Sequence, residues 1–445
     1  EWGADAYKIM QRIKAAADPY SLLNPGVIIN DDKEVHIKNL KDLPTVEEEV
    51  DKCIECGYCE PVCPSRNITL TPRRRIVVRR ELAKLKKTNA GKAYNELLED
   101  YKYDGLETCA VDGLCANACP VDINTGDLVK RLRRENHTSL ANKTALLVAK
   151  KFALVEKTAR ILLMTGAGLN RIAGKKTMIG ITKLLRKMIP AVPLWSAQLS
   201  SPPSLTALKR KNSKGQLHPT NQVTIVYFPS CISRLLGAAP AGKKNSMETF
   251  LEVAEKAGIE VKLMQNNLGT CCGQIFSSKG FTAAYVHTAN RIMEQLWASS
   301  EMGLHPVVMD VSSCTYTLQH MRPALLPEAQ EKFDQLKIMD SIDFLYDMVM
   351  PRHPVVKKKK SIVLHPVCSL KKMGTENKFK KIAEHFAKNV TIPLQAGCCG
   401  MAGDRGFIFP ELTASATFFE AMEVKASEYE GYYSTTKTCE IAMSE

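Results

Sequence analysis

The chain of 445 residues is 45% hydrophobic and 24% charged, and these globular values exclude global disorder and fibrous classes. No stretch reaches the roughly 18 uncharged apolar residues of a membrane-spanning helix, which excludes a transmembrane protein. The net charge is +14, but no zinc-finger, helix-turn-helix or stacking-sheet signature accompanies it, so we expect no nucleic acid as a partner.

Residues 1–43 predict one helix followed by an extended tail. Ile9 and Ile13 mark an apolar face, and Asp18-Pro19 ends the helical pattern. Because the chain begins with Glu1 rather than Met, we expect it to be processed or to be a piece of a longer protein.

Residues 44–140 contain two runs of cysteines, separated by a strongly helical insert over 72–101. The first run is Cys53-x2-Cys56-x2-Cys59-x3-Cys63-Pro64, which has the spacing of the bacterial ferredoxin motif. In that motif three thiolates bind one iron–sulfur cube and the fourth binds a second cluster. Zinc ribbons use paired CxxC elements instead, so we expect iron–sulfur ligation rather than zinc.

The second run is Cys109-x5-Cys115-x3-Cys119-Pro120, and Asp112 lies where a further ligand would complete the pattern. Crossed ligation, as in two-cluster ferredoxins, assigns a full 4Fe-4S cluster to Cys53, Cys56, Cys59 and Cys119. The second cluster then has only three thiolates, from Cys63, Cys109 and Cys115. It is either a 3Fe-4S cluster or a 4Fe-4S cluster with Asp112 as an oxygen ligand. Alternatively, Asp112 is only a turn residue before Gly113.

The helical insert excludes a compact bacterial ferredoxin. Residues 44–140 resemble the helical ferredoxin domain of the succinate dehydrogenase iron–sulfur subunit, in which a C-x5-C-x3-C-P run also follows a four-cysteine run. The resemblance implies an α-helical ferredoxin domain with two iron–sulfur clusters, the second of which passes electrons to quinone.

Residues 141–215 carry the charge excess, because the stretch from Lys143 to Lys214 has 15 basic residues and a single acidic one, Glu156. The segment predicts basic amphipathic helices that lie on an anionic bilayer, with Trp195 as an interfacial anchor. The apolar residues of these helices are Leu146, Leu147, Phe152, Leu154, Ile161, Leu162, Leu163, Met178, Ile181, Leu184, Leu185 and Ile189. Their basic residues are Lys150, Lys151, Lys157, Arg160, Arg171, Lys175, Lys176, Lys183, Arg186 and Lys187. Alternatively, the apolar faces pack against the cluster domains, or the segment binds an acidic partner subunit.

Residues 216–445 alternate short β-branched runs with helical segments, which is the pattern of α/β units. Their cysteines recur at offsets of 137, 127 and 125 residues. One set is Cys231, Cys271, Cys272 and Cys314, and the other is Cys368, Cys398, Cys399 and Cys439. We predict an α/β domain of two repeats, 216–353 and 354–445, with the cysteines gathered at the carboxyl ends of the strands.

The repeats resemble the cysteine-rich CCG domains of heterodisulfide reductase and of the iron–sulfur subunits of glycolate and glycerol-3-phosphate dehydrogenases. In those domains a CxxC motif closes the pattern, whereas Cys314 and Cys439 stand alone here. We therefore do not expect the five-thiolate noncubane cluster of heterodisulfide reductase. A four-thiolate iron–sulfur cluster in each half, a zinc ion and a metal-free thiol site remain open. For His305 and His365, which lie on apolar strands, we predict core packing.

Taken together, the motifs resemble, nearly end to end, the C-terminal iron–sulfur half of the large FAD-linked D-lactate dehydrogenases of bacteria. The segments that carry the resemblance are 18–26, 53–64 and 108–115, Asp112 included. Residues 1–43 then correspond to the tail of the FAD-linked oxidase domain. The flavin domain of the family lies outside these residues, so no residue of this chain is expected to be catalytic.

The resemblance implies that D-lactate is oxidised to pyruvate at an FAD held by an upstream domain of the same polypeptide. Electrons then leave through the iron–sulfur clusters toward respiratory quinone or a cytochrome, at the cytoplasmic face of the cell membrane. Two alternatives stay open. One is the corresponding part of a D-2-hydroxyglutarate, glycolate or glycerol-3-phosphate dehydrogenase, and the other is a non-enzymatic thiol or zinc docking scaffold.

Overall fold

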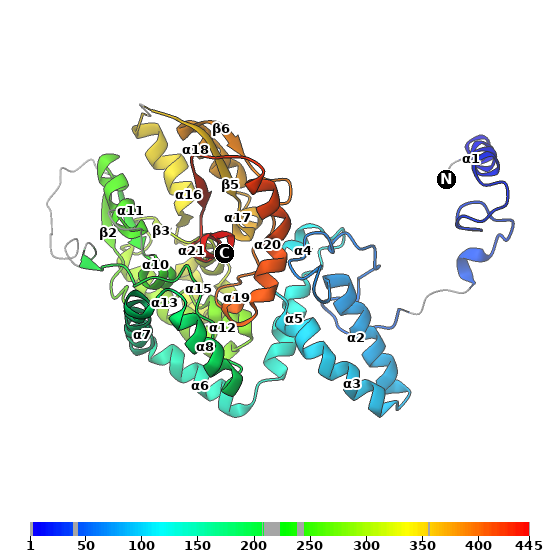
Figure 1. Cartoon of the computed structure of the whole chain (residues 1–445), viewed down its shortest axis with the longest axis horizontal. Coiled ribbons are helices and arrows are strands. Elements are labelled where there is room, and N and C mark those ends of the chain that lie inside the picture. The colour runs from blue at the N-terminus through cyan, green and yellow to red at the C-terminus, as the bar shows by residue number, and fades with distance from the viewer. Residues whose placement is uncertain are drawn as a thin grey trace. The chain divides into compact units, whose positions relative to one another are not determined.

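The computed structural model describes residues 3–38, 43–206, 208, 223–237, 244–354 and 357–444, and the chain divides into two units, 1–45 and 46–445 (Figure 1). The smaller unit contains α1 (Ala4–Ala17) and a short 3-10 helix, η1 (Val35–Ile37). Helix α1 ends where the sequence predicts. The carboxylate of Asp18 accepts hydrogen bonds of 2.9 Å from the backbone amides of Leu22 and Leu23, which stabilises the turn after the helix.

Five helices form what we call the helical region, residues 46–137. They are α2 (Pro72–Lys87), α3 (Gly91–Tyr101), the π-helix η2 (Lys102–Glu107), α4 (Leu114–Asn117) and α5 (Thr125–Glu135). Helix α2 begins where Thr71 caps the backbone amide of Arg74 and Pro72 occupies the first helical position. Its apolar face packs on α5 through Ile76 and Leu128. The predicted helical insert is thus a pair of helices, α2 and α3.

Three further helices follow the helical region in the chain and precede the first strand: α6 (Ser139–Lys150), α7 (Phe152–Ala173) and α8 (Thr177–Met188). A buried ion pair holds helix α7 against the domain that contains the sheets. Its acidic partner is Glu156, the single acidic residue between Lys143 and Lys214. Its carboxylate is buried and pairs with the buried Arg234, with N–O distances of 2.6 and 2.8 Å, and also accepts the backbone amide of Gly269 at 2.8 Å.

The first sheet has four parallel strands in the order β2-β1-β3-β4. They are β1 (Thr224–Phe228), β2 (Glu260–Leu263), β3 (Val307–Met309) and β4 (Ile338–Asp340). We call this sheet and its helices the first half. The helices are α10 (Cys231–Leu236), α11 (Ser246–Lys256), α12 (Gln274–Lys279), α13 (Thr282–Ser299), α14 (Ser312–Gln319) and α15 (Pro327–Asp334). Apolar clusters lie on both faces of the sheet, one with α13 and α14 and the other with α11. Burial on both faces explains why β1 and β3 read as continuous apolar runs.

The second sheet has three parallel strands in the order β6-β5-β7. They are β5 (Lys359–His365), β6 (Ala387–Thr391) and β7 (Tyr432–Ser434). We call this sheet and its helices the second half. The helices are α17 (Cys368–Met373), α18 (Glu376–Phe386), α19 (Arg405–Ile408), α20 (Pro410–Lys425) and α21 (Lys437–Ser444). A short connection of α16 (Ser341–Asp343), the π-helix η4 (Phe344–Val349) and η5 (Met350–Arg352) joins the sheets.

The two sheets share one strand order, because β6-β5-β7 matches β2-β1-β3, and β4 is an additional edge strand of the first. In this correspondence α10 matches α17, since each follows the central strand, and α14 matches α21. The two halves contact each other through α10 with α21 and through α14 with α17. Exchanging the halves exchanges these two contacts, so the halves are related by an approximate twofold axis.

Candidate metal centres

One cavity of the helical region is lined by four cysteines from both runs: Cys53, Cys56, Cys59 and Cys119. The rest of its wall includes Ile54, Ile76, Val121 and Ile123. The loop can turn around the cavity because Gly57 has a φ of +85°. Burial raises the pKa of Cys59 to about 11. Four soft sulfur donors in an apolar wall fit a 4Fe-4S cluster, whose binding removes the thiol protons.

A second cavity contains the other three cysteines of the runs together with the predicted fourth ligand: Cys63, Cys109, Cys115 and Asp112. Thr125, at the start of α5, borders both cavities. Burial raises the pKa of Cys115 to about 12. The tertiary structure therefore groups the cysteines as crossed ligation requires, since Cys119 lies with the first run and Cys63 with the second.

Asp112 has two kinds of contact. One carboxylate oxygen accepts the backbone amide of Leu114 at 2.8 Å, which is the turn role considered as an alternative. Burial raises the pKa of the same carboxyl group, which faces Cys63 and Cys115 of the second cavity and the thiol of Cys398 in the second half. The turn role and a position beside the thiols thus coexist in this side chain.

Buried arginines supply positive charge around the second cavity, which sequence reasoning missed. The guanidinium of Arg75 is fully buried and lies beside Cys63, with 3.7 Å between Nη1 and Sγ. It also donates to the Gly105 carbonyl at 2.7 Å and to the Ser65 hydroxyl at 2.9 Å. Arg133, also buried, donates to the carbonyl of Cys109 at 2.8 Å. Such charges stabilise anionic thiolates in a low-dielectric interior.

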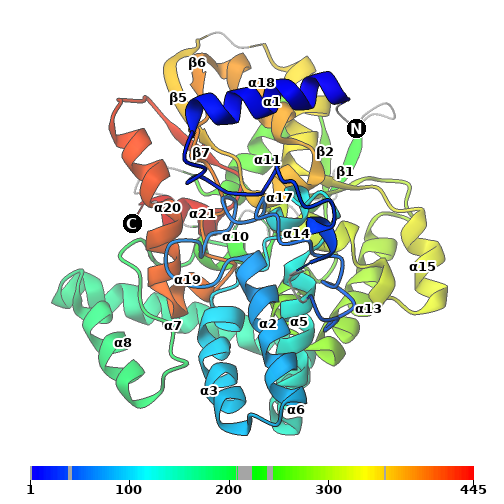
Figure 2. The same ribbon diagram turned by 90° about the vertical axis from the view of Figure 1, so that its right-hand side faces the viewer.

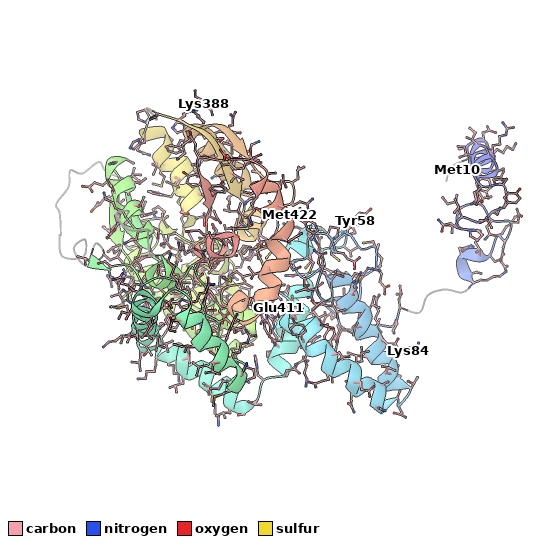
Figure 3. All side chains as sticks on the ribbon, viewed as in Figure 1. Met10, Tyr58, Lys84, Lys388, Glu411 and Met422 are labelled. Atoms are coloured by element: carbon pink, nitrogen blue, oxygen red, sulfur yellow. The ribbon has the colours of Figure 1, made fainter. Side chains whose placement is uncertain are left out.

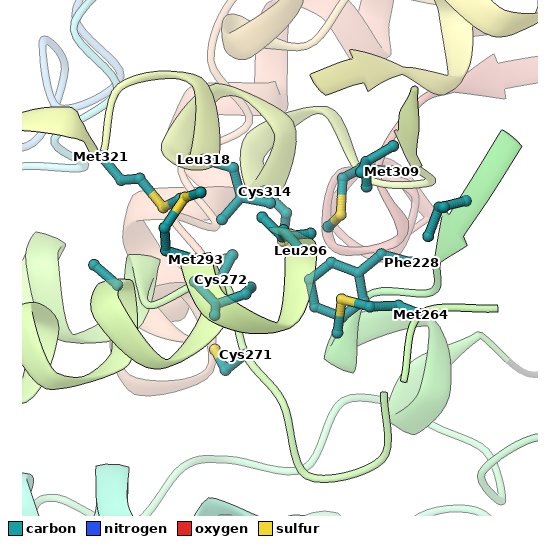
Figure 4. Packing of buried hydrophobic residues seen from close by; sticks show 14 of the residues in the cluster. Phe228, Met264, Cys271, Cys272, Met293, Leu296, Met309, Cys314, Leu318 and Met321 are labelled. Carbon is teal, nitrogen blue, oxygen red and sulfur yellow. The ribbon is translucent and has the colours of Figure 1, made fainter. Parts of the chain in front are cut away.

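The first half gathers its four cysteines behind the ends of β1 and β3. Cys231 begins α10, Cys314 lies in the first turn of α14, and Cys271 and Cys272 precede Gly273, whose φ is +86°. The Sγ atoms of Cys231 and Cys271 are 4.0 Å apart, and Cys272 contacts Cys314. Figure 4 shows Cys271, Cys272 and Cys314 within an apolar cluster that includes Met293 and Leu296.

The second half gathers its four cysteines in the same way, around the ends of β5 and β7. Cys398 contacts Cys368, and the Sγ atoms of Cys399 and Cys439 are 3.0 Å apart. The hydrogen bond from Cys439 lowers the pKa of Cys399 to about 5, and the neighbouring His365 acts in the same direction.

His365, the last residue of β5, is buried as predicted, but it is not simply a core residue. Its Nδ1 hydrogen-bonds Oε1 of the buried Glu420 at 2.7 Å, and its other ring nitrogen faces the Cys399 thiol. Burial lowers the pKa of this histidine, but its contacts with Cys399 and Glu420 outweigh burial and raise the pKa to about 10. The sequence signal that could have identified it is its position three residues before Cys368.

The second cavity of the helical region adjoins the thiols of the second half. Ala110 and Leu114 form a small apolar cluster with Cys398, and Cys368 packs against it. Lys372 of α17 lies against Gly113 and the ring of Tyr316, with Nζ 3.7 Å from the ring centroid. At the same junction, Glu411 of α20 (Figure 3) accepts the hydroxyl of Tyr103 at 2.7 Å. The helical region and the second half are thus held together beside their clustered thiols.

Two expectations for the basic segment are wrong. Trp195 is no interfacial anchor, because it is buried against α7: a Cβ at Gly166 would lie 2.5 Å from its ring, and its backbone amide donates to Thr182 of α8 at 3.0 Å. Arg160 is not a free surface cation, because its guanidinium donates to the carbonyls of Arg234 and Pro203. Trp195 packs the chain that follows α8 against α7, and Arg160 bonds α7 to neighbouring segments of the protein.

Comparison with known proteins confirms the two types of domain. A family model described as a 4Fe-4S dicluster domain matches residues 49–123, and one described as a cysteine-rich domain, CCG, matches residues 225–319. The chain therefore combines an iron–sulfur dicluster domain with a cysteine-rich domain, and the second half of the predicted repeat lies outside both matches.

Two relatives match across most of the chain. A D-2-hydroxyglutarate dehydrogenase of Pantoea ananatis is 22% identical over 471 aligned positions, which cover 91% of this chain and 44% of the relative. A D-2-hydroxyglutarate dehydrogenase of Pseudomonas putida is 20% identical over 478 positions, covering 94% of this chain and 45% of the relative. The chain thus spans less than half the length of these relatives.

Proposed function

We propose that this chain is the electron-transfer part of an FAD-linked dehydrogenase that oxidises D-lactate to pyruvate, with FAD on an upstream domain of the same polypeptide. The observation that carries the proposal is a continuous series of thiol sites. The two cavities of the helical region meet at Thr125, and the second adjoins the second half where Asp112 faces Cys398. Iron–sulfur clusters bound at such sites supply one-electron transfer between the flavin and a quinone or cytochrome.

The ligand scheme of the proposal is the crossed one. Cys53, Cys56, Cys59 and Cys119 hold a 4Fe-4S cluster, and Cys63, Cys109 and Cys115 hold the second. Asp112 either ligates the fourth iron of that cluster or borders an empty corner of a 3Fe-4S cluster. The grouping of these side chains in two separate cavities supports the scheme, and the buried Arg75 offsets the thiolate charge of the second.

The second half is proposed to be a further CCG repeat with a metal site of its own. The shared strand order, the approximate twofold relation and the recurring cysteines support this proposal. The first half offers Cys231, Cys271, Cys272 and Cys314, and the second offers Cys368, Cys398, Cys399 and Cys439.

D-2-hydroxyglutarate is the second candidate substrate, because both relatives are named as dehydrogenases of this compound. Both candidates are D-2-hydroxyacids whose oxidation delivers two electrons to a flavin. The iron–sulfur part can serve either, because the substrate binds in the upstream domain. The choice between them therefore depends on residues outside this chain.

The proposed location is the cytoplasmic face of the membrane, where quinone is accessible. Among the described helices, none is long and apolar enough to cross a bilayer. The surface that supports peripheral binding, here called the α7–α8 surface, consists of exposed apolar residues on two neighbouring helices that project from one side of the protein (Figure 2). These residues are Leu154, Ile161, Leu162, Met164, Leu169, Ile172, Ile181, Leu184, Leu185, Met188 and Ile189.

The α7–α8 surface has the composition of a helix pair that lies in a lipid interface. Ile172 is 88% exposed and Met188 is 79% exposed, which is unusual for side chains of this size without a partner. Exposed lysines flank them at positions 157, 175, 176, 183 and 187. Apolar residues at helical spacing with flanking lysines match an anionic bilayer in both hydrophobicity and charge.

The proposal is tested on the complete polypeptide, flavin domain included, purified without oxygen. Addition of D-lactate or D-2-hydroxyglutarate should bleach the iron–sulfur absorption near roughly 400 nm. Cys119→Ser should remove the signal of the 4Fe-4S cluster, and Cys63→Ser should remove that of the second cluster. A protein that contains zinc and no iron would refute the relay and favour the docking scaffold.

A further inference from the structure

The second half contains a buried histidine whose free nitrogen points into a group of thiols. His365 is 6% exposed, and Nε2 has no well-directed hydrogen-bond partner among the described residues. One ring nitrogen of His365 and the sulfur atoms of Cys399 and Cys439 all lie within 4.8 Å of one another, and all three residues are buried. Because Nδ1 is bonded to Glu420, Nε2 is the nitrogen that faces the thiols. The distances among the three atoms fit ligands of one metal centre.

We infer that Nε2 of His365 is a metal ligand, so that the second half holds a mixed sulfur–nitrogen centre. The inference rests on the proposal that this half binds metal, and it adds a donor that the cysteine pattern does not contain. Thiolate and imidazole together suit iron in an iron–sulfur cluster or a zinc ion.

Glu420 supplies the orientation that a ligating histidine needs. Its carboxylate, 3% exposed on α20, lies 2.7 Å from Nδ1 of His365. Histidines that bind metals characteristically donate their other ring N–H to a carboxylate, which fixes the tautomer and leaves the second nitrogen free to coordinate. Nδ1–H donating to Glu420 therefore directs the lone pair of Nε2 toward Cys399 and Cys439.

The first half shows that the shared fold does not require this polar pair. The offset of 137 residues matches Phe228 to His365, and the offset of 127 matches Met293 to Glu420. Phe228 and Met293 are both fully buried in the apolar cluster of the first half. Burying an imidazole and a carboxylate at these positions without a further partner for Nε2 would be unfavourable. The pair thus distinguishes the second half, and a metal held by Nε2 and the neighbouring Cys399 thiolate would satisfy both buried groups.

The chemical consequence is a difference between the two halves. The first offers thiols alone, whereas the second offers imidazole as well. Where the imidazole ligates iron in place of one of the four thiolates, the centre loses one negative charge, and in iron–sulfur proteins such a replacement raises the reduction potential. If iron occupies both halves, the second is then the stronger electron acceptor and lies next to the second cavity of the helical region.

The test measures metal and nitrogen coordination directly. The full chain, purified without oxygen, is analysed for iron and zinc. Pulsed EPR detects ¹⁴N coupling to a reduced iron–sulfur centre, and X-ray absorption at the zinc edge detects Zn–N scattering. We expect nitrogen coordination in the unmodified protein and its loss in His365→Phe. Metal retention against a chelator should weaken by at least the roughly 10-fold to 100-fold that loss of an outer-shell partner typically costs.

Two matched variants separate ligation from folding. His365→Cys should keep the metal, because it offers a thiolate, but should lose the nitrogen signal. His305→Phe, which replaces a histidine outside the thiol sites, should change neither. Nitrogen coordination that persists in His365→Phe or His365→Cys would overturn the inference, as would a metal-free second half with a stable Cys399–His365 ion pair. The EPR signals of the helical region are recorded in the same samples, so failure here is distinguishable from failure of the relay.

Discussion

The carboxyl group of Asp112 lies within hydrogen-bonding reach of the thiol of Cys398, although the two residues come from different domains. Asp112 also lines the cavity that contains Cys63, Cys109 and Cys115. One short side chain thus borders two thiol sites. This position makes it the most direct probe of how the helical region and the second half are linked.

Replacing Asp112 by cysteine should change the type of the second cluster if its fourth corner is empty. The variant supplies the missing fourth thiolate, so a 3Fe-4S cluster should be converted to a 4Fe-4S cluster. Low-temperature EPR of the air-oxidised protein should lose the 3Fe-4S signal, and the reduced protein should gain a 4Fe-4S signal. Asp127→Cys is the matched control, because Asp127 lies on the outer side of α5 and lines neither cavity. An unchanged spectrum in Asp112→Cys would contradict the ligand scheme.

Replacing Arg75 by methionine should weaken the second cluster. Loss of a fully buried guanidinium removes a positive charge beside Cys63 that also interacts with Cys109, which disfavours both the thiolates and an added electron. We expect a lower reduction potential for the second cluster and a loss of about 3–5 kcal/mol in the free energy of unfolding. Redox titration and denaturant unfolding measure the two effects. Arg74→Met, which replaces a half-exposed neighbour, should leave the potential unchanged.

Breaking the pair of Glu156 and Arg234 should destabilise the protein more than removing both charges. Both side chains are buried, so Glu156→Ala leaves an uncompensated guanidinium and should cost about 3–5 kcal/mol in the free energy of unfolding. The double variant Glu156→Leu, Arg234→Met should cost less, because no buried charge remains. A double-mutant cycle by denaturant unfolding gives the coupling. Additive effects of the single variants would show that α7 is not held by this ion pair.

Reversing the charge of lysines on the α7–α8 surface should weaken binding to anionic vesicles. At about 1 kcal/mol for each basic residue, changing Lys175, Lys176 and Lys183 to glutamate removes at least about 3 kcal/mol, or roughly 100-fold in affinity. Co-sedimentation with vesicles with and without anionic lipid, at low and high salt, measures the change. Binding that ignores lipid charge, or no binding by the unmodified protein, would refute the membrane assignment.

Two controls accompany the vesicle experiment. The same charge change on the end of α2, Lys84, Lys86 and Lys87 to glutamate, should have little effect, because these exposed lysines lie on α2 and outside the α7–α8 surface. Figure 3 labels Lys84. Replacing Ile172 and Met188 by serine should reduce binding without changing its dependence on salt, because it removes apolar area and no charge.

Much of the fold was predictable because its signals are local. The helical insert over 72–101, the strands before Cys231 and Cys368, and the helix over residues 4–17 all follow from periodicity, capping and turn residues that lie within a few positions of each other. The repeat was visible because both halves place their cysteines at the same points of a β-α unit, where a strand ends and a helix begins.

The function of individual side chains was less predictable where it depends on distant neighbours. The sequence pattern places Trp195 beside apolar amphipathic helices, but it does not show whether the ring meets lipid or Gly166 of α7, and the prediction failed there. In the sequence, His365 is one residue of an apolar strand. Only the fold shows that Glu420 of α20 hydrogen-bonds with it. Neither partner is close in sequence, so no local pattern carries the information.

The amino-acid sequence by itself determined the thiol donors and their number. Two cysteine runs with ferredoxin spacing, and two further sets of four cysteines, are chemical facts that any fold must accommodate. Only the tertiary structure decided which donors meet. The burial of Arg75 beside Cys63, the approach of Asp112 to Cys398 and the position of His365 beside Cys399 arise from the packing of elements remote in the chain. Thiol spacing is set by covalent geometry over a few residues, whereas these contacts are set by how buried surfaces fit together.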